Sequence, residues 1–105
     1  MAALLGAPHE FIDYAASKGA LDTLTIGLAK EAAGEGIRVN GIRPGLIDTE
    51  IHASGGDPDR AERLMATVPL GRIGTPEEVA EAALWLLSDA SSYTIGVTIN
   101  VSGGR

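Results

Sequence analysis

The sequence predicts an α/β fold in which two parallel strands belong to a helix-covered sheet. Three observations carry this prediction: a long Ala- and Leu-rich stretch without proline, two short stretches of strand-like alternation, and two capped helical stretches between them. Because the connection between the two strands is long enough for a crossover, we expect the strands to pair in parallel. Parallel sheets normally carry helices on both faces.

The first element is a long helix over about residues 11–33, where Ala and Leu dominate and two nearby glycines follow as helix terminators. Apolar and polar residues then alternate over residues 37–42, which predicts a strand. The turn-forming pair Pro44 and Gly45 is expected to end this strand.

A loop over residues 46–56 and a short helix are expected next. Asp57 followed by Pro58 matches a helix cap with proline at the first helical position, which predicts a helix to about Thr67. The whole stretch connects the predicted strand to the next strong helix signal.

That next signal is the strongest in the chain. Thr75, Pro76 and Glu78 match a capping box with proline in the first turn, and the helix is expected to run to about Ser88. Its apolar residues recur at helical spacing, so one face should pack on a core. These residues are Val79, Ala82, Ala83, Leu86 and Leu87.

The last element is a strand predicted over residues 94–101, where Val97, Ile99 and Val101 alternate with polar residues. Two strands alone make a marginal sheet, and an unpaired parallel edge favours association. The sequence therefore resembles part of a larger doubly wound sheet, either cut from a longer chain or completed by a partner.

Composition excludes several classes of function. A net charge of -6 argues against a nucleic-acid partner, because such proteins carry a clustered basic surface. The absence of cysteine favours a reducing, cytoplasmic location, and the apolar runs are too short to span a membrane. His9 and His52 lie far apart in the sequence, so no metal site is expected.

Tyr14 and Lys18 are the first catalytic candidates, because residues four apart lie on one face of a helix. Taken alone, the pair also fits a packed tyrosine beside a solvated lysine.

A longer ordered set of motifs resembles the short-chain dehydrogenase/reductase family across nearly the whole chain. The set comprises Tyr14-Ala15-Ala16-Ser17-Lys18, Ile37-Arg38-Val39-Asn40, Arg43-Pro44-Gly45 with Ile47 and Thr49, Gly71-Arg72, Thr75-Pro76-Glu77-Glu78-Val79-Ala80, and Asn100-Val101-Ser102-Gly103-Gly104.

The resemblance implies an oxidoreductase that uses NAD or NADP and acts on a small alcohol or carbonyl substrate. It implies a Rossmann-type doubly wound sheet, of which residues 1–105 would form the C-terminal portion, with a long helix, a strand, two helices and a strand. The N-terminal dinucleotide-binding half is not matched, because the sequence contains no Gly-rich strand-to-helix turn. The cofactor preference is therefore left open.

The resemblance also implies roles for single residues. Tyr14 would exchange a proton with the substrate oxygen, and Lys18 would activate it and bind the nicotinamide ribose. A free phenol has a pKa of about 10, so proton exchange near neutrality needs a nearby positive charge. Pro44, Gly45, Ile47 and Thr49 would contact the nicotinamide, although a Pro-Gly pair also suits an ordinary turn. Residues 48–69 would form a substrate lid.

Two departures from the family shape the functional expectation. The phosphate-binding turn is missing, and Met1-Ala2-Ala3 offers no serine where family members place a catalytic one. We therefore expect a truncated chain that is inactive, or nearly so, alone. The alternative is a non-catalytic module that forms homo-oligomers through the long helix. The small residues on that helix are Ala16, Gly19, Ala20, Thr23 and Gly27.

Overall fold

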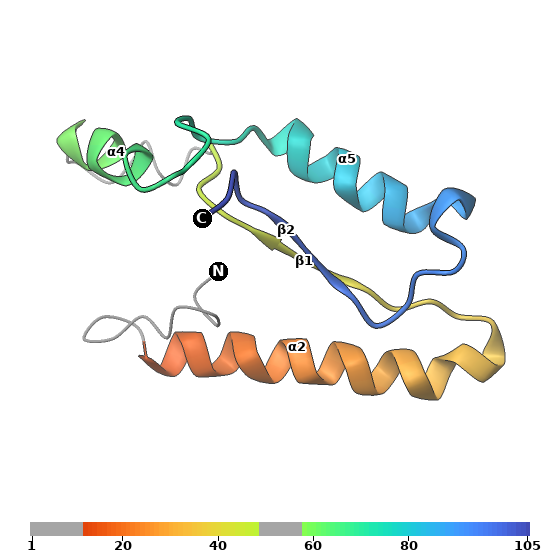
Figure 1. Ribbon diagram of the computed structural model, residues 1–105. Helices are drawn as coiled ribbons and strands as arrows, with labels where there is room; N and C mark the ends of the chain where they lie inside the picture. Colours follow the sequence, from red (N-terminus) through yellow and green to blue (C-terminus); the bar gives the residue numbers. More distant parts are fainter. Residues whose placement is uncertain (1–11, 49–57) are drawn as a thin grey trace.

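The computed structural model describes residues 12–48 and 58–105 (Figure 1). A two-stranded parallel sheet lies between α5 on one side and α2 on the other, while α4 lies beyond the carboxyl ends of the strands. The predicted order of a long helix, a strand, two helices and a strand is confirmed. The elements are α2 (Ile12–Ala32), the 3-10 turn η1 (Ala33–Glu35), β1 (Gly41–Pro44), α4 (Pro58–Met65), α5 (Pro76–Leu87), the 3-10 turn η2 (Asp89–Ser91) and β2 (Thr98–Val101).

The two strands are shorter than the sequence predicted. β1 and β2 pair in parallel from Gly41 opposite Thr98 to Pro44 opposite Val101. The predicted bounds at residues 37–42 and 94–101 are wrong, because the chain before each strand makes other bonds. The side chain of Asn40 there donates to the carbonyl of Thr94 and accepts from the amide of Val97, in place of a backbone ladder.

The two faces of the sheet differ in polarity. Arg43 and its partner Asn100 share the face toward α2, where the guanidinium of Arg43 reaches a carboxylate of that helix. Because side chains alternate along a strand, Ile42, Ile99 and Val101 lie on the opposite face, toward α5. The apolar core of the chain therefore lies between the sheet and α5.

Helix α2 is apolar around much of its circumference, as expected for a helix covered on more than one side. Only Ala15 and Ala29 are buried among its described residues, and a Cβ at Gly96 would lie 3.4 Å from the Cβ of Ala29. The backbone turns out of η1 at Gly36, whose φ of 76° favours glycine. Among the described helices, none is long and apolar enough to cross a bilayer.

Helix α5 begins as predicted. The amide of Glu78 donates to the hydroxyl of Thr75, and the carboxylate of Glu78 accepts from the amide of Thr75, which completes the capping box. Leu86 is buried, but Leu87 is 81% exposed, so its predicted place in the core is wrong. The helix turns about 100° per residue, which carries Leu87 away from the sheet.

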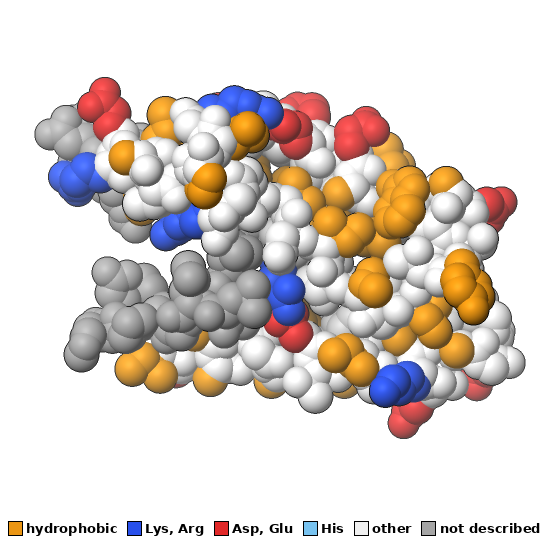
Figure 2. Space-filling model, viewed as in Figure 1, with side chains coloured by type: hydrophobic (Ala, Val, Ile, Leu, Met, Phe, Trp, Pro, Cys, Tyr) orange, Lys and Arg blue, Asp and Glu red, His pale blue; other side chains and the backbone are white. Residues whose placement is uncertain are grey.

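The outer side of α5 carries apolar side chains. Figure 2 shows hydrophobic side chains gathered over this helix and the segment after it. Trp85 is 44% exposed and lies among these side chains. The other exposed apolar residues in this region include Leu84, Leu87, Tyr93 and Val97.

Arg38 joins the end of α5 to the start of β1. Its Nη1 donates to the carbonyl of Leu86 at 2.9 Å and to the carbonyl of Ser91 at 3.0 Å, while its Nη2 donates to the carbonyl of Ser88 at 3.0 Å. Helix ends leave carbonyls without intrahelical partners, and a planar guanidinium can bond several of them at once. Arg38 therefore acts as the cap of this helix end.

Candidate functional site

The side chains of Tyr14 and Lys18 meet on the N-terminal half of α2. The Nζ of Lys18 lies 5.2 Å from the centroid of the Tyr14 ring, which is within range of a cation–π interaction. The Tyr14 side chain is 52% exposed, so it is not buried beneath the helix. This half of α2 lies at the same end of the molecule as the carboxyl ends of both strands (Figure 1), where open α/β sheets bind ligands.

Pro44 and Gly45 lie at the carboxyl end of β1. The amide of Gly45 donates to the carbonyl of Val101 at 2.9 Å, which continues the pairing one residue past the strand. A Cβ at Gly45 would lie 2.8 Å from the Cα of Ser102, closer than such atoms approach. Packing between the two chain segments that leave the sheet therefore requires glycine here, independently of any ligand.

Ile47 is buried and holds the chain after β1 in place. It forms a parallel bridge with Gly74, in which the amide of Asp48 donates to the carbonyl of Gly74 at 2.8 Å. The amide of Gly74 donates in turn to the carbonyl of Leu46 at 2.9 Å. Because successive peptide groups of an extended chain point to opposite sides, the amide and carbonyl of Ile47 itself point away from Gly74.

Thr49 lies outside the described residues, as do His9 and His52. The proposed lid over residues 48–69 is described only at its first residue and from residue 58 onward. The structure thus brings Tyr14 and Lys18 together on α2, and Pro44, Gly45 and Ile47 together on the segment that leaves β1.

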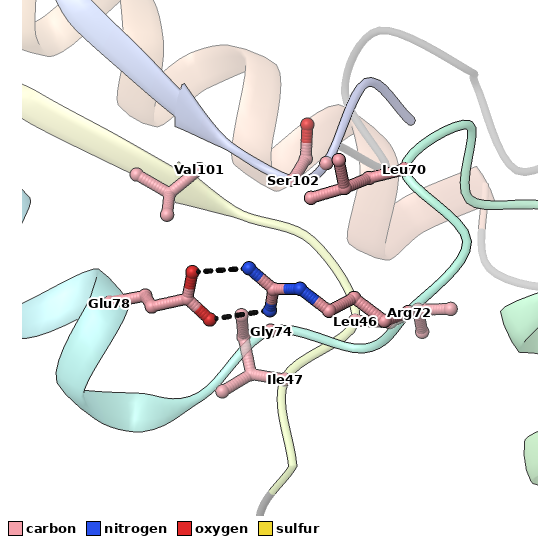
Figure 3. A pocket seen from close by; sticks show the side chains of 9 residues that line it. Leu46, Ile47, Leu70, Arg72, Gly74, Glu78, Val101 and Ser102 are labelled. Carbon is pink, nitrogen blue, oxygen red and sulfur yellow. Dashed lines mark hydrogen bonds and ion pairs between the residues drawn. The ribbon is translucent and has the colours of Figure 1, made fainter.

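An ion pair lies beneath this segment. Arg72 donates two hydrogen bonds of 2.8 Å to the carboxylate of Glu78, and Figure 3 shows the two groups side by side. The adjoining cavity has a volume of about 40 Å³, enough for little more than a water molecule. This cavity is too small for a substrate, so the pair supports the segment before α5 rather than a ligand.

The hydrogen bonds from Arg72, and then the amide of Thr75, lower the pKa of Glu78 from its ordinary value of 4.5 to about 2. Because the folded-state pKa is the lower one, the ionised carboxylate stabilises the fold above pH 4.5, and this contribution is lost as the pH falls toward about 2. Glu78→Gln should therefore lower the Tm at neutral pH. The decrease should be only a few degrees, because both side chains of the pair are exposed to water.

The check is a series of thermal melts of Glu78→Gln and the parent chain from neutral pH down to about pH 2. The difference in Tm should shrink over the acid range and be small at its lower end, where the carboxylate of Glu78 is half protonated in the folded chain. Glu77→Gln is the control, because it removes a carboxylate from the same helical turn. A difference that stays constant with pH would contradict this account.

Two arginine contacts were not predicted from the sequence. Arg43 donates through Nε and Nη2 to one carboxylate oxygen of Asp22, at 3.1 and 2.7 Å. These residues lie 21 positions apart, so the local sequence carries no signal for this contact. The second contact, between Arg38 and the end of α5, joins residues about fifty apart and leaves no local signal.

The sequence matches a family described as enoyl-(acyl carrier protein) reductase over residues 1–105. It is 56% identical over 105 residues to an uncharacterised oxidoreductase, YgfF, of Escherichia coli K12, covering 100% of this chain and 42% of that protein. It is 49% identical over 98 residues to 3beta-hydroxysteroid dehydrogenase 1 of Eggerthella lenta, covering 92% of this chain and 37% of that protein. The chain thus spans about two fifths of these relatives.

Solved structures resemble the fold closely. A short-chain dehydrogenase/reductase of Brucella melitensis, described as a glucose/ribitol dehydrogenase, superposes with a TM-score of 0.86 at 38% identity, over 99% of this chain and 41% of that one. A protein of Agrobacterium tumefaciens solved with bound NADP gives a TM-score of 0.79 at 39% identity, over 89% of this chain and 38% of that one.

Proposed function

Since this chain belongs to the short-chain dehydrogenase/reductase family of oxidoreductases, we propose that it carries the proton-transfer residues of an NAD(P)-dependent alcohol or carbonyl oxidoreductase. The observation that supports this most directly is the ammonium of Lys18, 5.2 Å from the centroid of the Tyr14 ring. The pair is exposed at the end of the molecule where ligands of α/β sheets bind.

Tyr14 is the general acid and base of the proposed reaction. When an alcohol is oxidised, the phenolate oxygen of Tyr14 takes the hydroxyl proton of the substrate while a hydride leaves the carbinol carbon; in the reverse direction the neutral phenol donates that proton. Lys18 stabilises the negative charge that develops on the phenol oxygen, because its ammonium is held one helical turn away.

The chemistry of the available groups fits a nicotinamide cofactor. Lys18 offers three donors that can bind ribose hydroxyls, and the outward amide and carbonyl of Ile47 suit a carboxamide. NAD or NADP, when bound, supplies or accepts the hydride. Pro44 and Gly45 fix the start of the segment that presents Ile47, through the bond from Gly45 to Val101.

The isolated chain is proposed to be inactive, or nearly so. Its sequence contains no Gly-rich turn between a strand and a helix, which in Rossmann folds binds the pyrophosphate. Its described sheet has two strands, fewer than a stable ligand-binding sheet requires. Binding of the whole cofactor therefore needs residues beyond these 105.

The test restores those residues. In the Eggerthella lenta steroid dehydrogenase, the matched 98 residues are replaced by the corresponding part of this chain. The chimera should oxidise a 3β-hydroxysteroid with NAD or NADP, whereas the isolated chain should show no measurable rate under the same conditions. A chimera that folds and binds cofactor but has no activity would contradict the proposal.

A second candidate function is association through α2. This helix exposes Leu21, Leu24 and Leu28, and a Cβ added at Gly19 or Gly27 would meet nothing within 4 Å, so a second copy could approach closely. Sedimentation velocity should then show a dimer or larger species that Leu24→Glu converts to monomer. A monomeric parent chain would exclude this function.

A further inference from the structure

We propose that Asp22 and Arg43 are positioning residues. Their ion pair fixes the N-terminal half of α2 over the carboxyl ends of the strands. It thereby holds Tyr14 and Lys18 at a fixed position relative to the segment that leaves β1. This inference rests on the proposed function of Tyr14. Neither residue touches the substrate in this arrangement; each acts through the placement of the helix.

The geometry of the pair is specific. Two nitrogens of Arg43 donate to one oxygen of Asp22, with the shorter bond at 2.7 Å. The two side chains are only 21% and 24% exposed, so water screens the pair less than a surface ion pair. Arg43 also donates to the side chain of Asn100, directly across the ladder, which fixes the direction of the guanidinium.

Little else joins α2 to the sheet in the described residues. A further close approach is at Ala29, where Gly96 lets the chain come near the helix, and Ala15 is the other buried residue of α2. Ala29 lies seven residues beyond Asp22, toward the C-terminal end of the helix, and Tyr14 lies eight residues before Asp22. Asp22 therefore restrains the half of the helix that carries the proposed catalytic pair.

The length of the helix makes this restraint matter. Tyr14 and Ala29 are separated by 15 residues, which is about 22 Å along the helix axis. A tilt of about 5° around Ala29 would move Tyr14 by about 2 Å over that length. A misplacement of about 1 Å can cost about 100-fold in rate, so losing the ion pair should reduce turnover strongly.

The first test uses the chimera described above. Asp22→Arg places two guanidinium groups together and should lower kcat by about 10- to 100-fold, with the KM for the cofactor changed less than about threefold. Asp22→Arg combined with Arg43→Asp restores an opposite pair and should recover at least about a tenth of the parent kcat. The control, Glu31→Gln, removes an exposed carboxylate from the same helix and should leave kcat unchanged.

The second test measures the placement of the helix without turnover. The chain has no cysteine, so spin labels can be attached at Ser17→Cys on α2 and Glu77→Cys on α5. Double electron–electron resonance on the labelled chimera, with any cysteine of its remaining part replaced by serine, should give a narrow distance distribution, which Asp22→Arg broadens and the double exchange narrows again.

The outcomes separate the two proposals. A parent chimera that lacks activity would contradict the role of Tyr14, while the label distances would still decide whether the ion pair places the helix. An active chimera in which Asp22→Arg keeps kcat within about twofold, or unchanged label distances in that variant, would overturn the positioning role.

Discussion

Tyr14→Phe should lower kcat of the steroid dehydrogenase chimera by about 10²- to 10⁴-fold, the range that general acid–base catalysis contributes. The change removes one oxygen and keeps the ring beneath the ammonium of Lys18, so cofactor binding should be almost unaltered. Initial rates and a fluorescence titration with NADH or NADPH measure the two effects separately.

Lys18→Met is the companion variant, because it keeps most of the length of the side chain and removes its charge. It should reduce kcat and also weaken cofactor binding, since the proposed lysine both stabilises the phenolate and binds the ribose. Full activity of the Tyr14→Phe chimera would contradict the proposed mechanism. Equal effects of the two variants on cofactor binding would contradict the separate roles.

Arg38→Ala should destabilise the isolated chain by about 3 kcal/mol or more, because hydrogen bonds to a charged group contribute about 1.5–3 kcal/mol each and their loss is not additive. The variant leaves the carbonyls of Leu86 and Ser91 without the guanidinium that bonds them. Ser91 is 1% exposed, so water reaches this site poorly. Urea unfolding followed by circular dichroism measures the change.

Arg38→Lys distinguishes the guanidinium fork from charge alone. An ammonium is a compact point charge, so it should not bond the end of α5 and the η2 turn at the same time. Arg38→Lys should therefore lose most of the stability that Arg38→Ala loses. Lys30→Ala, which removes an exposed cation from α2, is the control and should change stability little. A lysine variant as stable as the parent chain would show that charge alone is sufficient.

The sequence predicted the features that depend on near neighbours. The capping box of Thr75 and Glu78 needs residues three apart, and the turn after the long helix needs glycine at Gly36, whose φ is positive. The parallel pairing followed from the length of the crossover. The meeting of Tyr14 and Lys18 required only a helix, because residues four apart share a face.

Features that depend on distant contacts were not predictable. The strands begin later than their alternation suggested, because Asn40 bonds residues more than fifty positions away and takes the place of ladder contacts. Leu87 fits the apolar spacing of α5, but the direction of the helix relative to the sheet decides which side faces the core. The bonds of Arg38 and Arg43 likewise depend on tertiary placement.

The contrast between the two faces of the sheet makes the layers respond differently to solvent. A kosmotropic salt such as sulfate strengthens the burial of Ile42, Ile99 and Val101 against α5, whereas it weakens the largely buried Asp22–Arg43 attraction only slightly. Sulfate would thus stabilise the layer between the sheet and α5 more than the layer between the sheet and α2. Helix α2 can separate from the sheet while α5 remains packed on it. Hydrogen exchange would therefore begin along α2 before the sheet itself opens.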